Sequence, residues 1–320
     1  MGVSEGRSNT RVLVVGGTGY MGKRIVKASL AQGYETYVLQ RREIGLDIDK
    51  LQMLLSFKQD GAHLVDGSFS DHQSLVEAVK LVDVVICTMS GVHFRSHNIL
   101  LQLKLVDAIK EAGNVKRFLP SEFGMDPALL GHAIEPGRVT FDEKMTVRRA
   151  IEEANIPFTY ISANCFAGYF VGNLSQMGTL IPPKGDQVQL YADGTVKVAY
   201  NDEDDIATYT VKTISDPRTL NKTVYIRPPE NVITQRELVG MWEKLAGKEF
   251  EKVNFPEDQF LEQLKGQDYV AQVGRGHFYH CFYEGSTANF DIGEVGGEEA
   301  SELYPEVSYT RMTDYLKRYI

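Results

Sequence analysis

The sequence predicts an α/β protein, a Rossmann-type doubly wound parallel sheet with a smaller α+β C-terminal lobe. Three observations lead to this prediction. A glycine-rich turn at residues 16–22 follows an apolar strand and precedes a helix. The first half of the chain then alternates short apolar runs with helical periodicity, as βαβ units do. After Asn164 this alternation gives way to short strands, turns and helices in irregular order.

The predicted elements follow in chain order. Apolar runs indicate strands at residues 12–16, 35–39, 62–65, 82–88, 116–119 and 158–162, and their ends mark the edge of the sheet where a ligand binds. Helical periodicity lies between them, from about residue 20 to 28 and at residues 47–58, 71–80, 97–112 and 140–154. Asp71 is a candidate N-cap, and Gly113 ends the fourth helix.

The second half predicts the smaller lobe. A loop at residues 182–185 precedes two short, hairpin-like strands at residues 188–191 and 196–200. Helices are expected at residues 202–214, capped by Asp202, and at residues 234–245. We therefore expect a flexible leader at residues 1–10, a nucleotide-binding domain at 11–164 and a mainly substrate-binding lobe at 165–320, which can interleave with the first domain.

Composition excludes several classes of function. The chain has 320 residues, 43% of them hydrophobic and 24% charged, as in a soluble globular protein. Its net charge of −9 disfavours binding to nucleic acid. The apolar runs are too short to cross a membrane, and the polar N-terminus does not resemble a signal peptide. The separated Cys87, Cys165 and Cys281 fit buried, reduced thiols, so we expect a cytoplasmic protein.

The glycine-rich turn predicts an anion site. A helix N-terminus presents unpaired backbone N–H groups at the positive end of its dipole, and glycines let a pyrophosphate approach the backbone. The spacing GxxGxxG differs from the usual dinucleotide fingerprint, but the turn opens the first βαβ unit, where such a site belongs. The predicted site comprises Gly16, Gly17, Thr18, Gly19, Tyr20, Met21 and Gly22.

Basic residues after the second strand favour NADP(H) over NAD(H). NAD-binding proteins place an acidic residue near this strand end, where it binds the ribose 2′-hydroxyl. Here Arg41 follows the strand and Lys50 lies further on, and a guanidinium there pairs with a 2′-phosphate.

A lysine stands where reductases of this architecture usually carry Tyr-x-x-x-Lys. The matching window has Thr140 at the tyrosine position and Lys144 at the lysine position, and an aliphatic hydroxyl is too weak an acid to replace a phenol. Either catalysis was lost or Lys144 acts alone. Burial beside the cation Arg148, one helical turn away, would lower the pKa of Lys144 and make it a base. By pattern alone, a solvent-exposed helix surface is slightly favoured.

Four motifs and one single residue resemble one plant family. They are GGTGYMG (16–22) with Arg41, RFLPSEFGMDP (117–127), FDEKMTVRRAIE (141–152) and NCFAGYF (164–170). They are similar to the family that contains pinoresinol–lariciresinol reductases, phenylcoumaran benzylic ether reductases and isoflavone reductases, over nearly the whole chain after residue 10. Residues 89–106 and Met125 are most similar to the pinoresinol–lariciresinol reductases.

The resemblance implies a role for each candidate residue. Lys144 matches the general base. The glycine turn binds the pyrophosphate and Arg41 and Lys50 the 2′-phosphate of NADPH, and the remaining cofactor residues are Ser90, Gly91, Arg95, Asn98 and Arg148. Met125, Phe166 and His277 match substrate-binding positions. From the residues alone, Met125 and Phe166 are core residues by default, and His277 is more often structural.

The resemblance also implies the reaction, reduction of furofuran lignans at a benzylic ether, with no metal and with a homodimer as the assembly. Lys144 would deprotonate the substrate's phenol, the ether oxygen would leave to form a quinone methide, and hydride from NADPH would reduce it. Two alternatives stay open. One is a phenylcoumaran benzylic ether or isoflavone reductase. The other is a non-catalytic NADP(H)-sensing regulator, which has little need for Lys144.

Overall fold

The structure is a computed structural model, and it describes residues 9–41, 47–91 and 98–320. The chain forms two compact units that alternate along the sequence. Unit 1 comprises Met1–Glu122, Glu143–Tyr160 and Ala207–Lys222; unit 2 comprises Phe123–Asp142, Ile161–Ile206 and Thr223–Ile320. Each unit is described by itself below. The expected leader lies outside the described residues up to residue 8.

The sheet of unit 1 has five strands in the order β3-β2-β1-β4-β5. All its pairs are parallel, with β1 between β2 and β4. The predicted parallel, doubly wound sheet is therefore confirmed. The strands are β1 (Arg11–Val15), β2 (Glu35–Gln40), β3 (His63–Asp66), β4 (Val84–Cys87) and β5 (Arg117–Leu119).

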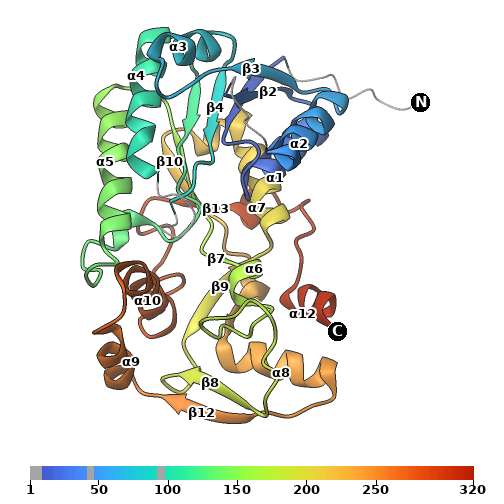
Figure 1. Cartoon of the computed structure of the whole chain (residues 1–320), viewed down its shortest axis with the longest axis vertical. Coiled ribbons are helices and arrows are strands. Elements are labelled where there is room, and N and C mark those ends of the chain that lie inside the picture. The colour runs from blue at the N-terminus through green and yellow to red at the C-terminus, as the bar shows by residue number, and fades with distance from the viewer. Residues whose placement is uncertain (1–8, 42–46, 92–97) are drawn as a thin grey trace. The chain divides into compact units, whose positions relative to one another are not determined.

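Helices cover both faces of this sheet, with α1 and α2 on one side and α3, α4 and the unit 1 part of α5 on the other (Figure 1). On the second side, alternate strand residues such as Leu13 and Val85 pack against these helices in one core. The bounds are α1 (Gly22–Ala31), α2 (Ile48–Gln59), α3 (His72–Lys80), α4 (Gln102–Ala112) and α5 (Val139–Glu153).

Local signals set the ends of these helices. Asp71 caps α3 by accepting a hydrogen bond from the Ser74 N–H, as predicted. Gly113, with φ +67°, ends α4 as predicted, because glycine adopts this left-handed conformation without strain. Helix α1 begins at Gly22 rather than near residue 20, and α4 begins at Gln102 after a 3₁₀ turn at Ile99–Leu101.

The expected sixth strand only touches the sheet of unit 1. A single parallel bridge joins Phe158 to Phe118 of β5. The strand itself, β6 (Thr159–Ser162), belongs to a three-stranded sheet with β10 (Lys222–Tyr225) and β13 (Glu298–Glu299). An apolar run specifies a buried strand, but its partner depends on segments more than 60 residues away along the chain.

The hairpin expected in the second half is wrong. The two strands form, as β8 (Gln187–Tyr191) and β9 (Lys197–Asn201), but do not pair with each other. β8 pairs with β12 (Glu251–Phe255), while β9 lies between β7 (Cys165–Phe166) and β11 (Val232–Thr234). A turn between two short strands does not by itself bring them together, because distant strands compete for the same edges.

The remaining helices complete the chain. Two of them are predicted ones: α7 (Glu203–Lys212), where Asp202 accepts from the Asp204 N–H at 2.9 Å, and α8 (Gln235–Ala246), which starts at a Thr234–Glu237 capping box. The others are α6 (Ala167–Phe170), α9 (Glu257–Leu264), α10 (Tyr269–Phe282), α11 (Ala300–Leu303) and α12 (Met312–Leu316).

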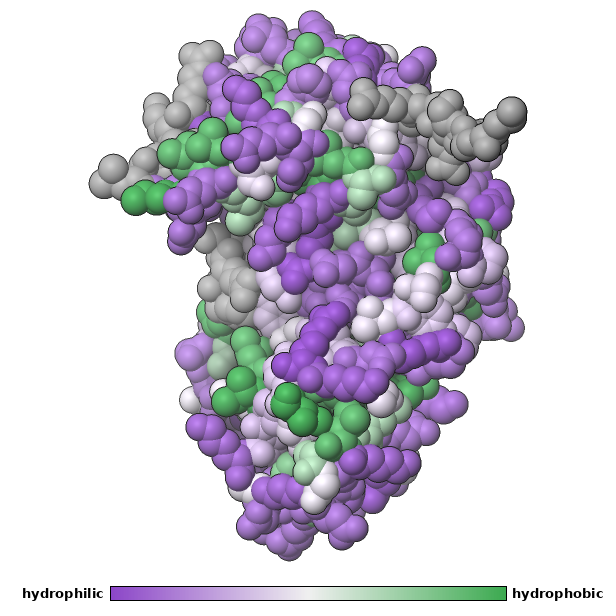
Figure 2. Space-filling view, turned by 90° about the vertical axis from the view of Figure 1, so that its right-hand side faces the viewer, coloured by the Kyte–Doolittle hydropathy of each residue, from purple (hydrophilic) through white to green (hydrophobic). Residues whose placement is uncertain are grey.

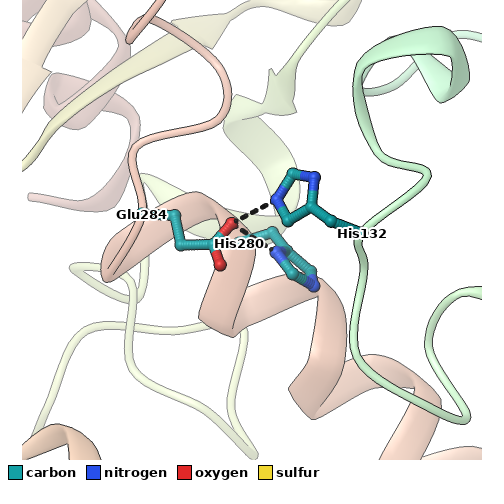
Figure 3. A group of neighbouring side chains, drawn as sticks. All are labelled: His132, His280 and Glu284. Carbon is teal, nitrogen blue, oxygen red and sulfur yellow. Dashed lines mark hydrogen bonds and ion pairs between the residues drawn. The ribbon is translucent and has the colours of Figure 1, made fainter.

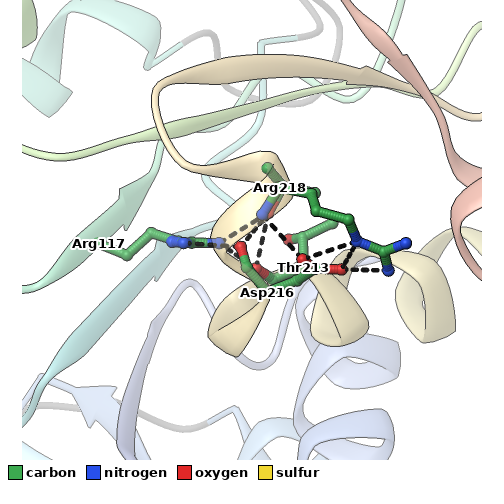
Figure 4. A network of polar contacts seen from close by, with 5 residues as sticks. Arg117, Thr213, Asp216 and Arg218 are labelled. Carbon is green, nitrogen blue, oxygen red and sulfur yellow. Dashed lines mark hydrogen bonds and ion pairs between the residues drawn. The ribbon is translucent and has the colours of Figure 1, made fainter.

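A buried arginine attaches the late segment of unit 1 to its sheet (Figure 4). The guanidinium of Arg117 on β5 donates to the Thr213 carbonyl, to the Thr219 hydroxyl at 2.7 Å and to the Asp216 carbonyl at 3.0 Å. The Asp216 carboxylate pairs instead with Arg218 at 2.6 Å. This network fixes the 213–219 turns beside β5, which explains why residues 207–222 belong to unit 1.

The surface combines hydrophilic residues with separate apolar patches, as the face in Figure 2 shows. Among the exposed apolar residues, Ile48, Leu51 and Leu55 follow one another along α2. Within the described residues no helix is both long and apolar enough to cross a membrane.

Asp83 lies directly before β4, at the amino-terminal ends of the parallel strands, and its buried carboxylate makes the stability of the fold depend on pH. Asp83 accepts hydrogen bonds from the backbone N–H and Nε of Arg11, at 3.0 and 3.2 Å, and pairs with Lys116 at 3.1 Å. Burial alone would raise the pKa of Asp83, but these partners outweigh it and lower the pKa to about 2. The carboxylate therefore stabilises the fold above its unfolded pKa of 3.8, and this stabilisation is lost as pH falls towards 2.

We expect Asp83→Asn to lower the free energy of unfolding at pH 7 by no more than about 2 kcal/mol. The deficit relative to wild type should shrink below pH 4, become small near pH 2 and vanish below it, because protonation then removes the same charge from the wild type. Urea denaturation of both proteins across this range measures it. A deficit that stays constant with pH would contradict the assignment.

Candidate active site

The glycine turn joins β1 to α1 by a close approach that requires glycine. Gly16 has φ +83°, and its carbonyl accepts the Gly19 N–H at 2.9 Å. A Cβ on Gly22 would lie 2.0 Å from the Gly16 oxygen, so only glycine lets the helix start there. A Cβ on Gly17 would lie 2.7 Å from a methyl group of Val38. The unusual spacing therefore follows from packing of the helix start onto the strand end.

The start of α1 suits an anion. Its N-cap, Met21, offers no side-chain cap, and the first turn contains no acidic residue. Lys23 and Arg24 add positive charge, and the Arg24 side chain donates to the Tyr20 carbonyl at 2.8 Å. The turn lies where β1 neighbours β4, the switch point of a doubly wound sheet. These residues fit the pyrophosphate of a dinucleotide.

The end of β4 lies beside the glycine turn. The Thr88 hydroxyl donates to the Val15 carbonyl at 2.9 Å. Further on, the Asn98 N–H donates to the Ser90 carbonyl at 3.0 Å, and a Cβ on Gly91 would lie 3.1 Å from Ile99. The structure thus brings together three expected cofactor residues, Ser90, Gly91 and Asn98. The fourth, Arg95, lies outside the described residues.

The two residues expected at the 2′-phosphate are both exposed. Arg41 comes directly after β2, and Lys50 lies on the first turns of α2. Lys50 pairs with Asp47, at 2.8 Å between Nζ and Oδ2. A phosphate would compete with this carboxylate for Lys50. Arg41 lies directly after the second strand, where the residue that recognises the 2′-phosphate is expected. The roles of Arg41 and Lys50 remain predictions.

Lys144 is buried. Its residue is 7% exposed and Arg148 4%, whereas Arg149 on the same helix is exposed. The interpretation of this face of α5 as a solvent-exposed surface is therefore wrong: the residue spacing is the same for a solvated face and for one packed on the end of a sheet. The Lys144 Nζ donates to the backbone carbonyl of Glu122 at 2.8 Å.

Arg148 forms a buried ion pair. Its Nε and Nη2 donate to the two carboxylate oxygens of Glu122, at 2.7 and 2.5 Å. The guanidinium also lies over the ring of Tyr160, 4.1 Å from its centroid. From the sequence we predict that the positive charge of Arg148 lowers the pKa of Lys144. In the structure, the carboxylate of Glu122 pairs with Arg148 and balances this charge.

Sequence reasoning assigned no role to Glu122 or to its neighbour Ser121. The Ser121 hydroxyl donates to the Met89 carbonyl at 2.6 Å, and its N–H donates to the buried Gln102 side chain at 2.7 Å. These bonds hold the chain after β5 against the end of β4. One signal in the sequence could have identified Glu122. It is an acidic residue three positions after an apolar strand, and the following helix carries an arginine, Arg148, that can pair with it.

Thr140 stands where a usual reductase carries the tyrosine that donates a proton. Thr140, at the tyrosine position, has a buried hydroxyl with no hydrogen-bond partner in the described part of the chain. The Tyr160 hydroxyl donates to Glu152 at 3.0 Å. Burial, together with the carboxylates of Glu152 and Glu122, raises the pKa of Tyr160 well above its usual value, so it does not supply a proton.

The three expected substrate residues lie in unit 2. Met125 is buried, with its sulfur 3.6 Å from that of Cys281 on α10. His277, also on α10, lies 3.1 Å from the Gly137 carbonyl through Nε2. Phe166 is partly buried at the start of α6. Core packing explains Met125, whereas the substrate roles of all three remain predictions.

One group in unit 2 has the composition of a metal site (Figure 3). Possible ligand atoms of His132, His280 and Glu284 lie within 4.8 Å of one another. However, the Ile134 N–H donates to His280 Nε2 at 3.0 Å, so the proton of this ring is on Nδ1, which donates to Glu284 at 2.7 Å. A metal on Nδ1 would force the proton onto Nε2, where it would face another donor. The group is therefore better described as a hydrogen-bonded cluster in which His280 and Glu284 hold residues 132–134 in place.

Comparison with known proteins decides the family. The model of the NmrA-like family matches residues 8–316. The chain belongs to the NmrA-like family. An "isoflavone reductase homolog" of Lupinus albus is 75% identical over 97% of this chain and 99% of its own length. The bifunctional pinoresinol-lariciresinol reductase of Linum perenne is 71% identical, over 97% of this chain and 98% of its own.

A solved structure agrees with these relatives. The structure of AtPrR2 with NADP+ and (+)pinoresinol is 63% identical, covers 98% of this chain and 99% of its own, and has a TM-score of 0.95. The resemblance based on the glycine turn, Arg41 and the three other motifs is confirmed, and so is the Rossmann-type fold.

Because the buried Thr140 hydroxyl has no partner among the described residues, we expect that removing it stabilises the protein. A buried hydroxyl without a partner costs about 1–3 kcal/mol, so we expect Thr140→Val to raise the free energy of unfolding by about 1 kcal/mol. Denaturant unfolding measures it. Thr146→Val on the same helix is the control, because the Thr146 hydroxyl accepts from Arg149 and should give no gain. A Thr140→Val protein no more stable than wild type would show that water satisfies the hydroxyl.

From the tautomer of His280 we predict that zinc does not change the thermal stability of the protein. We expect neither an excess of Zn²⁺ nor a chelator to change the Tm, because His280 Nδ1 carries a proton rather than a free lone pair. Thermal unfolding with each additive measures it. A Tm that rises with Zn²⁺ in the wild type but not in His132→Ala would establish a metal site and overturn the tautomer assignment.

Proposed function

We propose that the protein is an NADPH-dependent reductase of furofuran lignans. It opens the benzylic ether of pinoresinol to give lariciresinol, and then that of lariciresinol to give secoisolariciresinol. The identity to a bifunctional pinoresinol-lariciresinol reductase and to AtPrR2, over nearly the full length of each, supports this substrate. The single structural observation that carries the proposal is a buried lysine, Lys144, without the usual tyrosine beside it.

The residues of unit 1 fit NADPH. The Gly16–Gly22 close approach leaves the α1 N-terminus uncapped for the pyrophosphate. Arg41 lies where a 2′-phosphate is recognised, with Lys50 as its second cation. Ser90, Gly91 and Asn98 extend the proposed site from the end of β4. Arg148 and Arg95, the latter outside the described residues, are the other cofactor residues that we propose. Bound NADPH supplies the hydride for the reduction.

Lys144 acts as a general base on the substrate. A benzylic ether accepts no hydride as it stands. When the neutral amine of Lys144 takes the proton of the para phenol, the ring's electrons move through the para carbon and expel the ether oxygen. The resulting quinone methide accepts hydride at the benzylic carbon, and the ring becomes a phenolate again. The released alkoxide and the phenolate take up two protons, one of them that held on Lys144, so each turnover consumes one proton and one hydride.

The substrate residues proposed in unit 2 are Met125, Phe166 and His277. A carbonyl oxygen only accepts, so the His277 Nε2 next to Gly137 carries the proton, and Nδ1 is an acceptor in the neutral ring. We propose that His277 contacts a hydroxyl of the lignan, and that Met125 and Phe166 contact its aromatic rings. A homodimer in the cytoplasm completes the proposal, to be checked by the mass of the protein in solution.

If Lys144 is the base, its replacement should abolish most of the turnover and leave NADPH binding intact. We expect Lys144→Met, which keeps the apolar stem, to lower kcat for pinoresinol by about 10²-fold or more. NADPH affinity, measured separately by fluorescence titration, should stay near wild type. Arg149→Met, at an exposed position of the same helix, should keep wild-type kcat. Near-wild-type turnover by Lys144→Met with bound NADPH would show that Lys144 is not the base.

The substrate supplies an independent test. Pinoresinol with its para hydroxyls methylated has no proton for Lys144 and should not be reduced, although it still competes with pinoresinol. Chiral analysis of products from racemic pinoresinol gives the enantiomer preference and the number of reductions. Preferred turnover of a phenylcoumaran or an isoflavone would favour the other reductases of the family. NADPH binding with no turnover of any of them would favour a regulator.

A further inference from the structure

Glu122 connects the end of the sheet to the base. Its backbone carbonyl accepts from Lys144 Nζ at 2.8 Å, while its side chain holds Arg148 through two bonds of 2.7 and 2.5 Å. The Glu122 and Arg148 side chains are 4% and 5% exposed. One residue shortly after β5 thus holds two basic side chains that lie one turn apart on α5.

We propose that Glu122 is a positioning residue for Lys144, an inference that rests on the proposed function. A neutral lysine amine has two N–H donors and one lone pair. The Glu122 carbonyl can only accept, so it takes an N–H, and the lone pair must point away from it. The carbonyl therefore sets the direction from which Lys144 can receive a proton.

The carboxylate of Glu122 keeps that carbonyl in place. Two parallel bonds to a planar guanidinium fix the side chain in direction as well as distance. Arg148 is itself fixed over the Tyr160 ring at 4.1 Å. The backbone on either side is also constrained, because Ser121 is bonded to Met89 and Gln102 and Phe123 has φ +38°, in a region that non-glycine residues rarely adopt. Such strain persists only where the surroundings determine the conformation.

The carboxylate also sets the charge around Lys144. With Glu122 ionised, the Arg148 charge is balanced within the pair. Without the carboxylate, a buried cation would remain one helical turn from Lys144 and would disfavour its ammonium form. Loss of Glu122 therefore changes both the direction of the lone pair and the pH at which the amine loses its proton.

Glu122→Gln separates these effects from cofactor binding. We expect kcat for pinoresinol to fall by about tenfold to a hundredfold, the cost of misplacing a catalytic group. KM and NADPH affinity should stay near wild type, and the acid limb of the kcat–pH profile should move to lower pH. Glu122→Asp keeps the charge and should keep the limb in place. Glu153→Gln, the same change at an exposed position of α5, should match wild type in every measurement.

A second readout needs no turnover. Acetylation of Lys144 by acetic anhydride, followed against pH by mass spectrometry of its peptide, reports the neutral amine directly. The midpoint should be lower in Glu122→Gln than in wild type and unchanged in Glu153→Gln. If wild type does not reduce pinoresinol but this midpoint moves, the proposed function fails and the coupling of Glu122 to Lys144 stands. An unchanged midpoint and unchanged kcat in folded Glu122→Gln overturn the proposal.

A paired variant keeps the test decisive if Glu122→Gln does not fold. Replacing both ends of a buried ion pair with apolar residues is often tolerated, so Glu122→Leu with Arg148→Met should fold. It lacks the bidentate anchor, so its kcat should fall as in the single variant, without the uncompensated cation and thus without the shift of the acetylation midpoint. Wild-type kcat in this folded double variant would overturn the positioning role.

Discussion

The bidentate pair between Glu122 and Arg148 is the interaction on which the geometry around Lys144 depends. Two charges taken out of water are stabilising only when the geometry is good and the remaining donors and acceptors are satisfied. Here both carboxylate oxygens accept from one guanidinium, and the aromatic face of Tyr160 covers it. Removing one partner of such a pair costs about 3–5 kcal/mol, far more than an exposed pair contributes. The end of β5 and the middle of α5 are therefore fixed together, with Lys144 one turn away.

Much of the fold was predictable because its signals are local. A run such as residues 82–88 predicts a strand buried on both faces, Asp71 and Gly113 mark helix ends, and alternation of strands and helices implies parallel pairing. The cofactor end was predictable for the same reason: Gly16, Gly19 and Gly22 encode a close approach within one turn. The sequence thereby predicted β1 to β5 and the loops at their carboxyl ends.

What the sequence missed depends on contacts distant along the chain. β8 and β9 form where predicted, yet pair with β12 and β11, which lie tens of residues later. Nothing in the local pattern distinguishes that arrangement from a hairpin. Likewise, residues 144 and 148 have the spacing of any helix face. Burial of Lys144 is decided by the segment after β5, and the partner of Arg148 lies 26 residues earlier in the chain.

The same surroundings limit the chemistry that unit 1 can perform. A carbonyl reductase needs an acid that protonates the oxygen as hydride arrives. At the tyrosine position of the sequence stands Thr140, whose hydroxyl is aliphatic, and in unit 1 the Tyr160 phenol donates to Glu152 and has a raised pKa. In the mechanism that we propose, Lys144, with one N–H held by the Glu122 carbonyl, offers a lone pair instead. A site that provides a base without an acid suits a substrate that must lose a proton before it accepts hydride, and a para-hydroxybenzyl ether is such a substrate because its phenolate expels the ether oxygen.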